Sequence, residues 1–157
     1  MRLIKKIKFE MVIALVMIIL LFPFMFFIAV LIKIESKCPF LFWSKRYGIS
    51  KNLFYMPKFR SMSINTPIVT TRRLINPDVY ITRVGKIIRK TSIDELPQLW
   101  SIFIGDMSFI GPRPLLWTEK RLLSQREKFK GNSIKPGITG WAQVNGRDMN
   151  SPQKKIE

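Results

Sequence analysis

The chain has 157 residues, 47% of them hydrophobic, and its 27 basic and 10 acidic side chains give a formal net charge of +17. It contains no histidine and one cysteine, which excludes Ser-His and Cys-His nucleophiles, imidazole bases, the usual zinc sites and an internal disulfide. This length is sufficient for one modest soluble core and a membrane element. The charge predicts anionic partners: lipid headgroups, nucleic acid or phosphorylated small molecules.

An uninterrupted apolar stretch runs from Met11 to Ile32. At about 1.5 Å per residue, a helix of this length crosses roughly 30 Å of hydrocarbon. The stretch is too long for a cleaved signal peptide, and no small-residue cleavage site follows it. We therefore predict a membrane-embedded helix within residues 1–35.

The flanks and the middle of this helix bear on its path through the membrane. Basic residues occur on both sides of it: Arg2, Lys5, Lys6 and Lys8 before, and Lys33, Lys37, Lys45 and Arg46 after. The positive-inside rule would place both ends in the cytoplasm, and Pro23 near the middle predicts a kink. A re-entrant hairpin that bends at Pro23 satisfies both observations. We favour it over a straight span, which the length also permits.

Residues 36–157 contain no repeat, low-complexity tract or long linker, and we predict that they form one compact cytosolic unit. Residues 38–43 are expected to be a short extended segment at membrane level, because aromatic side chains favour the interface. Residues 51–63 fit either a strand or an irregular loop.

A short basic amphipathic helix is predicted between residues 81 and 90, because its apolar positions recur at i, i+3 and i+7. The apolar positions are Ile81, Val84 and Ile88, and the basic ones are Arg83, Lys86 and Lys90. This helix either lies along the membrane surface or presents an ordinary solvated cationic face.

Asp94 and Glu95 are the only adjacent carboxylates in the chain. The apolar positions after them predict a helix that ends at Gly105; they are Leu96, Leu99, Trp100 and Phe103. Two starts are open. In the first, Ser92 would be the N-cap and Glu95 would complete a capping box. In the second, Asp94 would be the N-cap and Pro97 would lie in the first turn; this second start fits the proline better.

Either start places both carboxylates at a helix N-terminus, where the helix dipole favours their anionic form. On its own this position indicates a structural cap. It also suits chemistry on phosphate, since an ionised carboxylate attacks without a general base and hard oxygen ligands are what Mg²⁺ prefers.

Cationic segments that suit phosphate oxygens lie elsewhere in the chain. Arg113 stands between Pro112 and Pro114, which restrict the backbone and present a planar, bidentate guanidinium from a stiff mount. Residues 58–61 and 89–92 add further lysine, arginine and hydroxyl donors. The turn-rich residues 135–147 either bind a ligand or connect strands.

Five ordered segments resemble those of bacterial sugar transferases, the monotopic polyprenyl-phosphate phosphoglycosyl transferases. They are KFRSM at 58–62, ITRVG at 81–85, RKTSIDELPQL at 89–99, GDMSFIGPRP at 105–114 and KPGITGWAQV at 135–144. The resemblance extends from the basic N-terminus to Arg147. It implies an α+β, helix-rich fold with a proline-kinked re-entrant membrane helix, a catalytic domain on the cytoplasmic face of the bacterial inner membrane, and surface-lying amphipathic helices.

The resemblance also implies a reaction. Such enzymes transfer a sugar 1-phosphate from a nucleotide diphosphate sugar, typically a UDP-sugar, to undecaprenyl phosphate, and so initiate a surface glycan that downstream glycosyltransferases extend. Asp94 would form the covalent phosphosugar and Glu95 would assist. Mg²⁺ is the expected cofactor, and Asp94 and Glu95 are its expected ligands. The substrate-binding residues are then expected to be Lys58, Arg60, Arg89, Arg113 and Gln143.

Some positions depart from the family pattern: Cys38 replaces a usual glycine, Ser44 a usual glutamine, and Phe22 a small residue. The cytosolic sugar transferase domain, residues 36–157, is also expected to lack the C-terminal extension that the family usually has. A truncated, inactive homologue is therefore one alternative. A second alternative is a non-catalytic membrane-anchored basic protein that binds anionic phospholipid. Nucleic acid is not expected as a partner, because no groove-reading pattern accompanies the charge.

Overall fold

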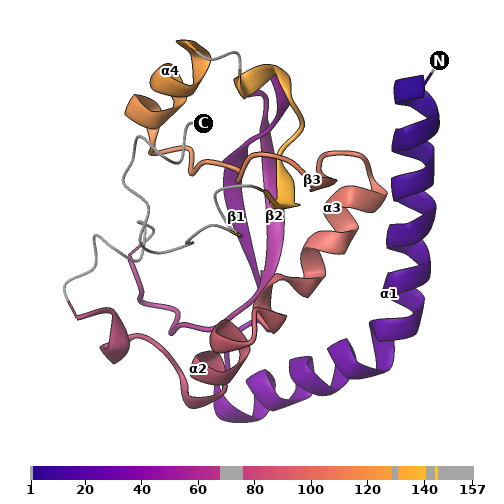
Figure 1. Ribbon diagram of the computed structural model, residues 1–157. Helices are drawn as coiled ribbons and strands as arrows, with labels where there is room; N and C mark the ends of the chain where they lie inside the picture. Colours follow the sequence, from indigo (N-terminus) through magenta and orange to yellow (C-terminus); the bar gives the residue numbers. More distant parts are fainter. Residues whose placement is uncertain (1, 68–75, 129–130, 141–143, 145–157) are drawn as a thin grey trace.

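The computed structural model describes residues 2–67, 76–128, 131–140 and 144, and it is built of helices and short strands (Figure 1). The helices are α1 (Arg2–Glu35), α2 (Arg83–Lys90), α3 (Leu99–Phe103) and α4 (Lys120–Lys128), with 3₁₀ helices at Ile49–Lys51, Pro77–Val79, Ile93–Gln98 and Gly131–Ser133. The strands are β1 (Leu41–Tyr47), β2 (Leu53–Phe59), β3 (Ser108–Ile110) and β4 (Gly137–Thr139). The predicted helix-rich α+β class is confirmed.

Helix α1 is 34 residues long and contains Pro23. It is long and apolar enough to cross a membrane, by length and composition, and its ribbon changes direction part-way along its length (Figure 1). Most of its large apolar side chains are exposed, including Ile19 at 63% and Leu20 at 72%.

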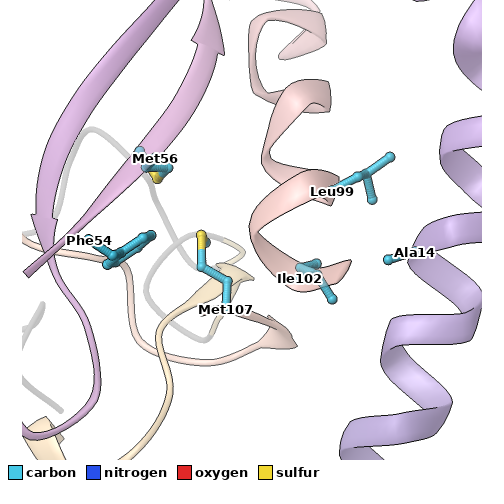
Figure 2. Close-up of a cluster of buried hydrophobic side chains, with 6 residues drawn as sticks. All are labelled: Ala14, Phe54, Met56, Leu99, Ile102 and Met107. Atoms are coloured by element: carbon cyan, nitrogen blue, oxygen red, sulfur yellow. The ribbon is translucent and has the colours of Figure 1, made fainter. Parts of the chain in front are cut away.

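The two halves of α1 pack against different parts of the chain. Ala14 belongs to a core cluster with Leu99 and Ile102 of α3, and the rest of that cluster comes from Phe54, Met56 and Met107. Figure 2 shows α3 between Ala14 on one side and these three side chains on the other. Ile28 and Ile32 join a second cluster with Phe59 of β2 and Ile88 of α2.

Polar contacts also tie α1 to the rest of the protein at both ends of its apolar stretch. The two carboxylate oxygens of Glu10 accept from the Ser108 hydroxyl at 2.8 and 2.9 Å. Those of Glu35 accept from the backbone N–H groups of Arg83 and Val84 at 2.6 and 3.0 Å. Glu35 therefore satisfies two of the donors that the start of α2 leaves unpaired.

Strands β1 and β2 form an antiparallel hairpin in which Leu41 pairs with Phe59 and Tyr47 with Leu53. The segment 51–63, for which the sequence left a strand or a loop open, is thus mainly strand. The extended segment predicted at residues 38–43 begins at Leu41 and continues beyond Trp43. Strands β3 and β4 are parallel.

Helix α2 confirms the predicted basic amphipathic helix, with one correction. Ile88 is buried on its inner face, and the three predicted basic positions are exposed. Ile81 precedes the helix and pairs instead with Met62, because Thr82 is the N-cap and accepts a hydrogen bond from Gly85 N–H at 2.9 Å. Gly85 is required here, since a Cβ would overlap the backbone of Ser61.

Ser92 is the N-cap of the helix that carries Asp94 and Glu95, as one of the two predicted starts had it, but its hydroxyl does not cap the helix and Asp94 is not the N-cap. Ser92 precedes a 3₁₀ helix with φ 59° and makes no side-chain cap, while Asp94 lies inside that helix. The predicted apolar face is wrong in part, because Ile102 is buried where Trp100 is 48% exposed. The predicted end is right: α3 stops before Gly105, whose φ is 88°.

Candidate active site

The acidic pair is held in a tight turn rather than at the tip of a regular α-helix. Ser92 has the left-handed conformation, which is uncommon for a residue with a Cβ. Its carbonyl accepts from Glu95 N–H at 3.1 Å, which closes the first turn of Ile93–Gln98. This turn buries both carboxylates: Asp94 is 8% exposed and Glu95 is 9% exposed.

Lys58 of β2 is a cationic partner of Glu95 in this pair. Its Nζ lies 2.8 Å from Glu95 Oε1, and both side chains are largely buried. Burial lowers the pKa of Lys58 from its ordinary value of 10.5, and the nearby charges of Glu95 and Asp94 partly offset that shift. A buried lysine needs such carboxylates to remain charged, since an uncompensated buried cation is costly.

Arg113 brings a second cation to the same oxygen. Its Nη2 lies 3.4 Å from Glu95 Oε1, and its side chain is 40% exposed. Glu95 Oε1 thus accepts from two cations, one buried and one that reaches toward solvent. Because the side chain of Arg113 is partly exposed, an incoming anion has a guanidinium to bind without displacing Lys58.

The backbone around Arg113 is held by groups that the sequence interpretation missed. Arg126 of α4 donates from Nη1 to the Arg113 carbonyl at 3.0 Å. Arg46 of β1 donates from Nη1 to the Pro114 carbonyl at 3.2 Å. Neither arginine lies in a segment whose sequence indicates phosphate binding, so only the tertiary fold identifies them as partners of this backbone segment.

The remaining predicted substrate-binding residues are Arg60, Arg89 and Gln143. Arg60 donates from Nε to the Pro39 carbonyl at 2.9 Å and lies over the ring of Phe42, with 5.5 Å between Cζ and the ring centroid. Arg89 lies in the last turn of α2 and is partly buried. Gln143 lies outside the described residues.

The model of one protein family, described as bacterial sugar transferase, matches residues 1–157. The chain belongs to the bacterial sugar transferase family. Among its relatives, the protein named uncharacterized sugar transferase EpsL of Bacillus subtilis (strain 168) is 41% identical over 133 residues, which cover 85% of this chain and 64% of the relative.

Two longer relatives carry names that state a reaction. The UDP-glucose:undecaprenyl-phosphate glucose-1-phosphate transferase of Xanthomonas campestris pv. campestris is 37% identical over 147 residues, 92% of this chain and 30% of the relative. The UDP-N-acetylgalactosamine-undecaprenyl-phosphate N-acetylgalactosaminephosphotransferase of Aeromonas hydrophila is 42% identical over 127 residues, 78% of this chain and 29% of the relative. The chain thus spans less than two thirds of the length of each of these sugar transferases.

The acidic pair of this sugar transferase is too small to form a metal cage by itself. Within the described ranges, no group of three or more His, Cys, Asp or Glu residues could hold a metal ion. Mg²⁺ is commonly held by one or two carboxylates together with water and substrate phosphates. Asp94 and Glu95 fit that second mode, in which a diphosphate supplies the remaining oxygens.

Proposed function

We propose that this sugar transferase moves a sugar 1-phosphate from a nucleotide diphosphate sugar, a UDP-sugar as in the names of its relatives, to undecaprenyl phosphate. The observation that carries the proposal is the buried Asp94-Glu95 pair beside Lys58 and Arg113, within the ordered motifs of the family. The product would be a lipid-linked sugar from which a surface glycan such as an exopolysaccharide is begun.

In the proposed first step, a carboxylate oxygen of Asp94 attacks the phosphorus that bears the sugar. An O–P bond forms, the bond between that phosphorus and the bridging oxygen breaks, and the nucleoside monophosphate leaves with the electron pair. In the second step a phosphate oxygen of undecaprenyl phosphate attacks the same phosphorus. The Asp94 carboxylate is released and a polyprenyl diphosphate sugar forms, so no general base is needed.

The cations have separate tasks in this scheme. Arg113, the more exposed one, binds diphosphate oxygens through its planar fork. Lys58 and Arg113 orient Glu95, so that Glu95 supports the position of its neighbour. A bound Mg²⁺, held by Asp94 and Glu95, would supply further neutralisation of the diphosphate charge.

The proposed place of the reaction is the cytoplasmic face of the bacterial inner membrane, with α1 re-entrant. Glu10 and Glu35 lie near opposite ends of the apolar stretch, yet both contact the part of the chain that carries the acidic pair. A straight helix spanning roughly 30 Å of hydrocarbon would separate those contacts by the membrane. A bend at Pro23 allows both ends to stay on one side, and the cationic flanks then meet anionic headgroups.

The reaction is tested with the full chain in detergent or nanodiscs, given undecaprenyl phosphate, Mg²⁺ and a panel of nucleotide sugars. We expect release of the nucleoside monophosphate, reduced roughly 10³-fold or more in Asp94→Asn because a neutral amide is not a nucleophile. Equal release by Asp94→Asn, or no release from any donor by the unaltered chain, would defeat the catalytic proposal.

The re-entrant arrangement is tested by cysteine labelling in cells. Cys38 is the natural thiol after α1, and Lys6→Cys in a Cys38→Ser background places one before the apolar stretch. We expect both thiols to resist an impermeant reagent added from outside. Labelling of the Lys6→Cys thiol from the outer face would establish a straight span.

A further inference from the structure

All three carbonyl groups of the segment Pro112-Arg113-Pro114 accept hydrogen bonds from other parts of the chain. Proline has no backbone N–H, so two of its three residues cannot donate a hydrogen bond. The Pro112 carbonyl accepts from Gly137 N–H at 3.0 Å, and the Arg113 carbonyl from Arg126 at 3.0 Å. The third, that of Pro114, accepts from Arg46 at 3.2 Å.

Arg46 is fixed on both sides of this contact. Its Nε donates to the Ser44 hydroxyl at 2.9 Å, and its backbone forms an isolated antiparallel bridge with Leu116. On either side of that bridge, Tyr47 N–H donates to the Leu115 carbonyl at 2.9 Å and Trp117 N–H to the Lys45 carbonyl at 3.4 Å. The Pro114 carbonyl thus meets a guanidinium that strand β1 has already oriented.

The charge of Arg46 is costly where it lies. Burial, followed by repulsion from Arg113, lowers the pKa of Arg46 to about 10, while Glu119 and Glu95 raise it. Its two hydrogen-bond acceptors are neutral oxygens. Arg46 is only partly buried, and replacing buried charges by apolar groups of similar size is often neutral for stability, so packing alone does not require an arginine at this position.

We propose that Arg46 is a positioning residue for Arg113: by holding the Pro114 carbonyl, it fixes the direction in which Arg113 presents its guanidinium to the diphosphate of the donor. The inference rests on the proposed function of Arg113 in binding that diphosphate. Arg46 does not touch the substrate. Its effect on the reaction passes through the Pro112-Arg113-Pro114 mount.

A double-mutant cycle tests this dependence. Steady-state kinetics of nucleoside monophosphate release are compared for Arg46→Gln, Arg113→Gln and the double variant of the full chain, with the exposed α4 residue changed in Arg121→Gln as control. We expect Arg46→Gln to lower kcat/KM roughly tenfold, mainly through the KM of the nucleotide sugar. We expect the double variant to match Arg113→Gln within about threefold.

Fold losses that multiply in the double variant would overturn the inference, because Arg46 would then act independently of Arg113. Arg46→Lys provides the same test should Arg46→Gln not fold. It keeps the charge but cannot reproduce the fixed fork, so we expect a loss of a few fold that disappears in the Arg113→Gln background. A loss that persists there contradicts the inference.

The outcome is separable from that of the proposed function. An inactive unaltered chain defeats the catalytic proposal, whereas an active chain with multiplying losses defeats only the role of Arg46. Calorimetric binding of UDP supplies a readout without turnover, because UDP carries the diphosphate. In that assay Arg46→Gln should weaken binding only when Arg113 is present, and equal weakening in both backgrounds overturns the inference.

Discussion

The outer surface of α1 and the cluster of Lys58, Glu95 and Arg113 reverse the usual distribution of apolar and charged groups. Helix α1 exposes large apolar side chains, with Leu20 at 72%, whereas Glu95 is only 9% exposed. Water-soluble domains bury such aliphatic groups and leave carboxylates outside. Each reversal calls for a partner of matching chemistry: lipid chains suit the exposed surface of α1, whereas the buried carboxylate of Glu95 already has Lys58 and Arg113.

The two regions also differ in how they are encoded. The exposed surface of α1 comes from one continuous apolar stretch. The cluster is assembled from strand β2, the 3₁₀ helix Ile93–Gln98 and the loop after β3. A change on the exposed surface of α1 should therefore affect membrane association and leave the chemistry of the cluster intact, whereas a change in the cluster should do the opposite.

For the comparison of these two regions, the largest expected effect is that of a charge on the outer surface of α1. Ile19 is 63% exposed, and an arginine near the centre of a membrane helix costs about 2.5–3.5 kcal/mol. We expect Ile19→Arg to move much of the protein from the membrane pellet to aggregates or the soluble fraction. Ile64→Arg is the matched control, because Ile64 is 60% exposed in the loop after β2. Equal sedimentation of the two variants would show that lipid does not surround Ile19.

Within the cluster, Arg113→Lys should have the next largest effect. A lysine keeps the charge but loses the planar fork that grips two phosphate oxygens. We expect kcat/KM to fall roughly ten- to hundredfold, or about 1.4–2.7 kcal/mol of transition-state stabilisation. Arg121→Lys on the exposed side of α4 should be neutral. Unchanged kinetics in Arg113→Lys would refute bidentate phosphate binding.

The lowered pKa of Lys58 predicts an alkaline limit to activity. As pH rises through that pKa, at a value below the ordinary 10.5, Lys58 loses the charge that faces Glu95 and the rate should fall. Between the folded and unfolded pKa values the unfolded chain binds more protons at Lys58, so this group's contribution to the free energy of unfolding rises with pH. Activity and this contribution to stability thus change in opposite directions.

A pH–rate profile of nucleoside monophosphate release measures this limit. Lys58→Arg should move this limb to higher pH, because the ordinary pKa of arginine lies well above that of lysine. The same limb in both proteins would assign the titration to another group.

The sequence predicted the elements that depend on local pattern. The apolar stretch gave α1, the spacing of Val84 and Ile88 gave α2, and Gly105 marked the end of α3. Ser92 is the N-cap, as one predicted start had it, but the predicted side-chain cap failed because Ser92 takes a left-handed conformation and closes a 3₁₀ turn through its carbonyl. The prediction of the buried face of α3 was wrong in part. Helix α1 and strand β2 enclose α3 from two sides, so Ile102 packs inward where Trp100 was expected.

The sequence predicted the charged residues of the candidate site but not the residues that hold their backbone in place. Lys58 and Arg113 were identified as phosphate-type donors, and the fold places both on Glu95. Arg46 and Arg126 were not, because their contacts with Pro114 and Arg113 join residues that only the folded chain brings together. Arg60, which resembles Lys58 in sequence context, contacts Pro39 instead.

The smallest expected effect concerns Glu35, where α1 meets the part of the chain that carries the cluster. Its carboxylate caps α2 by accepting from Arg83 and Val84 N–H, a charged acceptor at a helix N-terminus that typically contributes about 1 kcal/mol. Glu35→Gln keeps one acceptor oxygen and loses the charge. We expect the Tm in detergent, followed by circular dichroism, to fall by roughly 2–4 °C.

Glu127→Gln is the control for this last change, since Glu127 pairs with Lys51 on the surface and is 55% exposed; exposed pairs contribute about 0–1 kcal/mol. If α2 depends on Glu35 for its attachment to α1, Glu35→Gln should also weaken protection of α2 amides against hydrogen exchange while those of β1 and β2 stay protected. Uniform loss of protection across α2 and the hairpin would mean that Glu35 supports the whole fold rather than the junction between the membrane helix and α2.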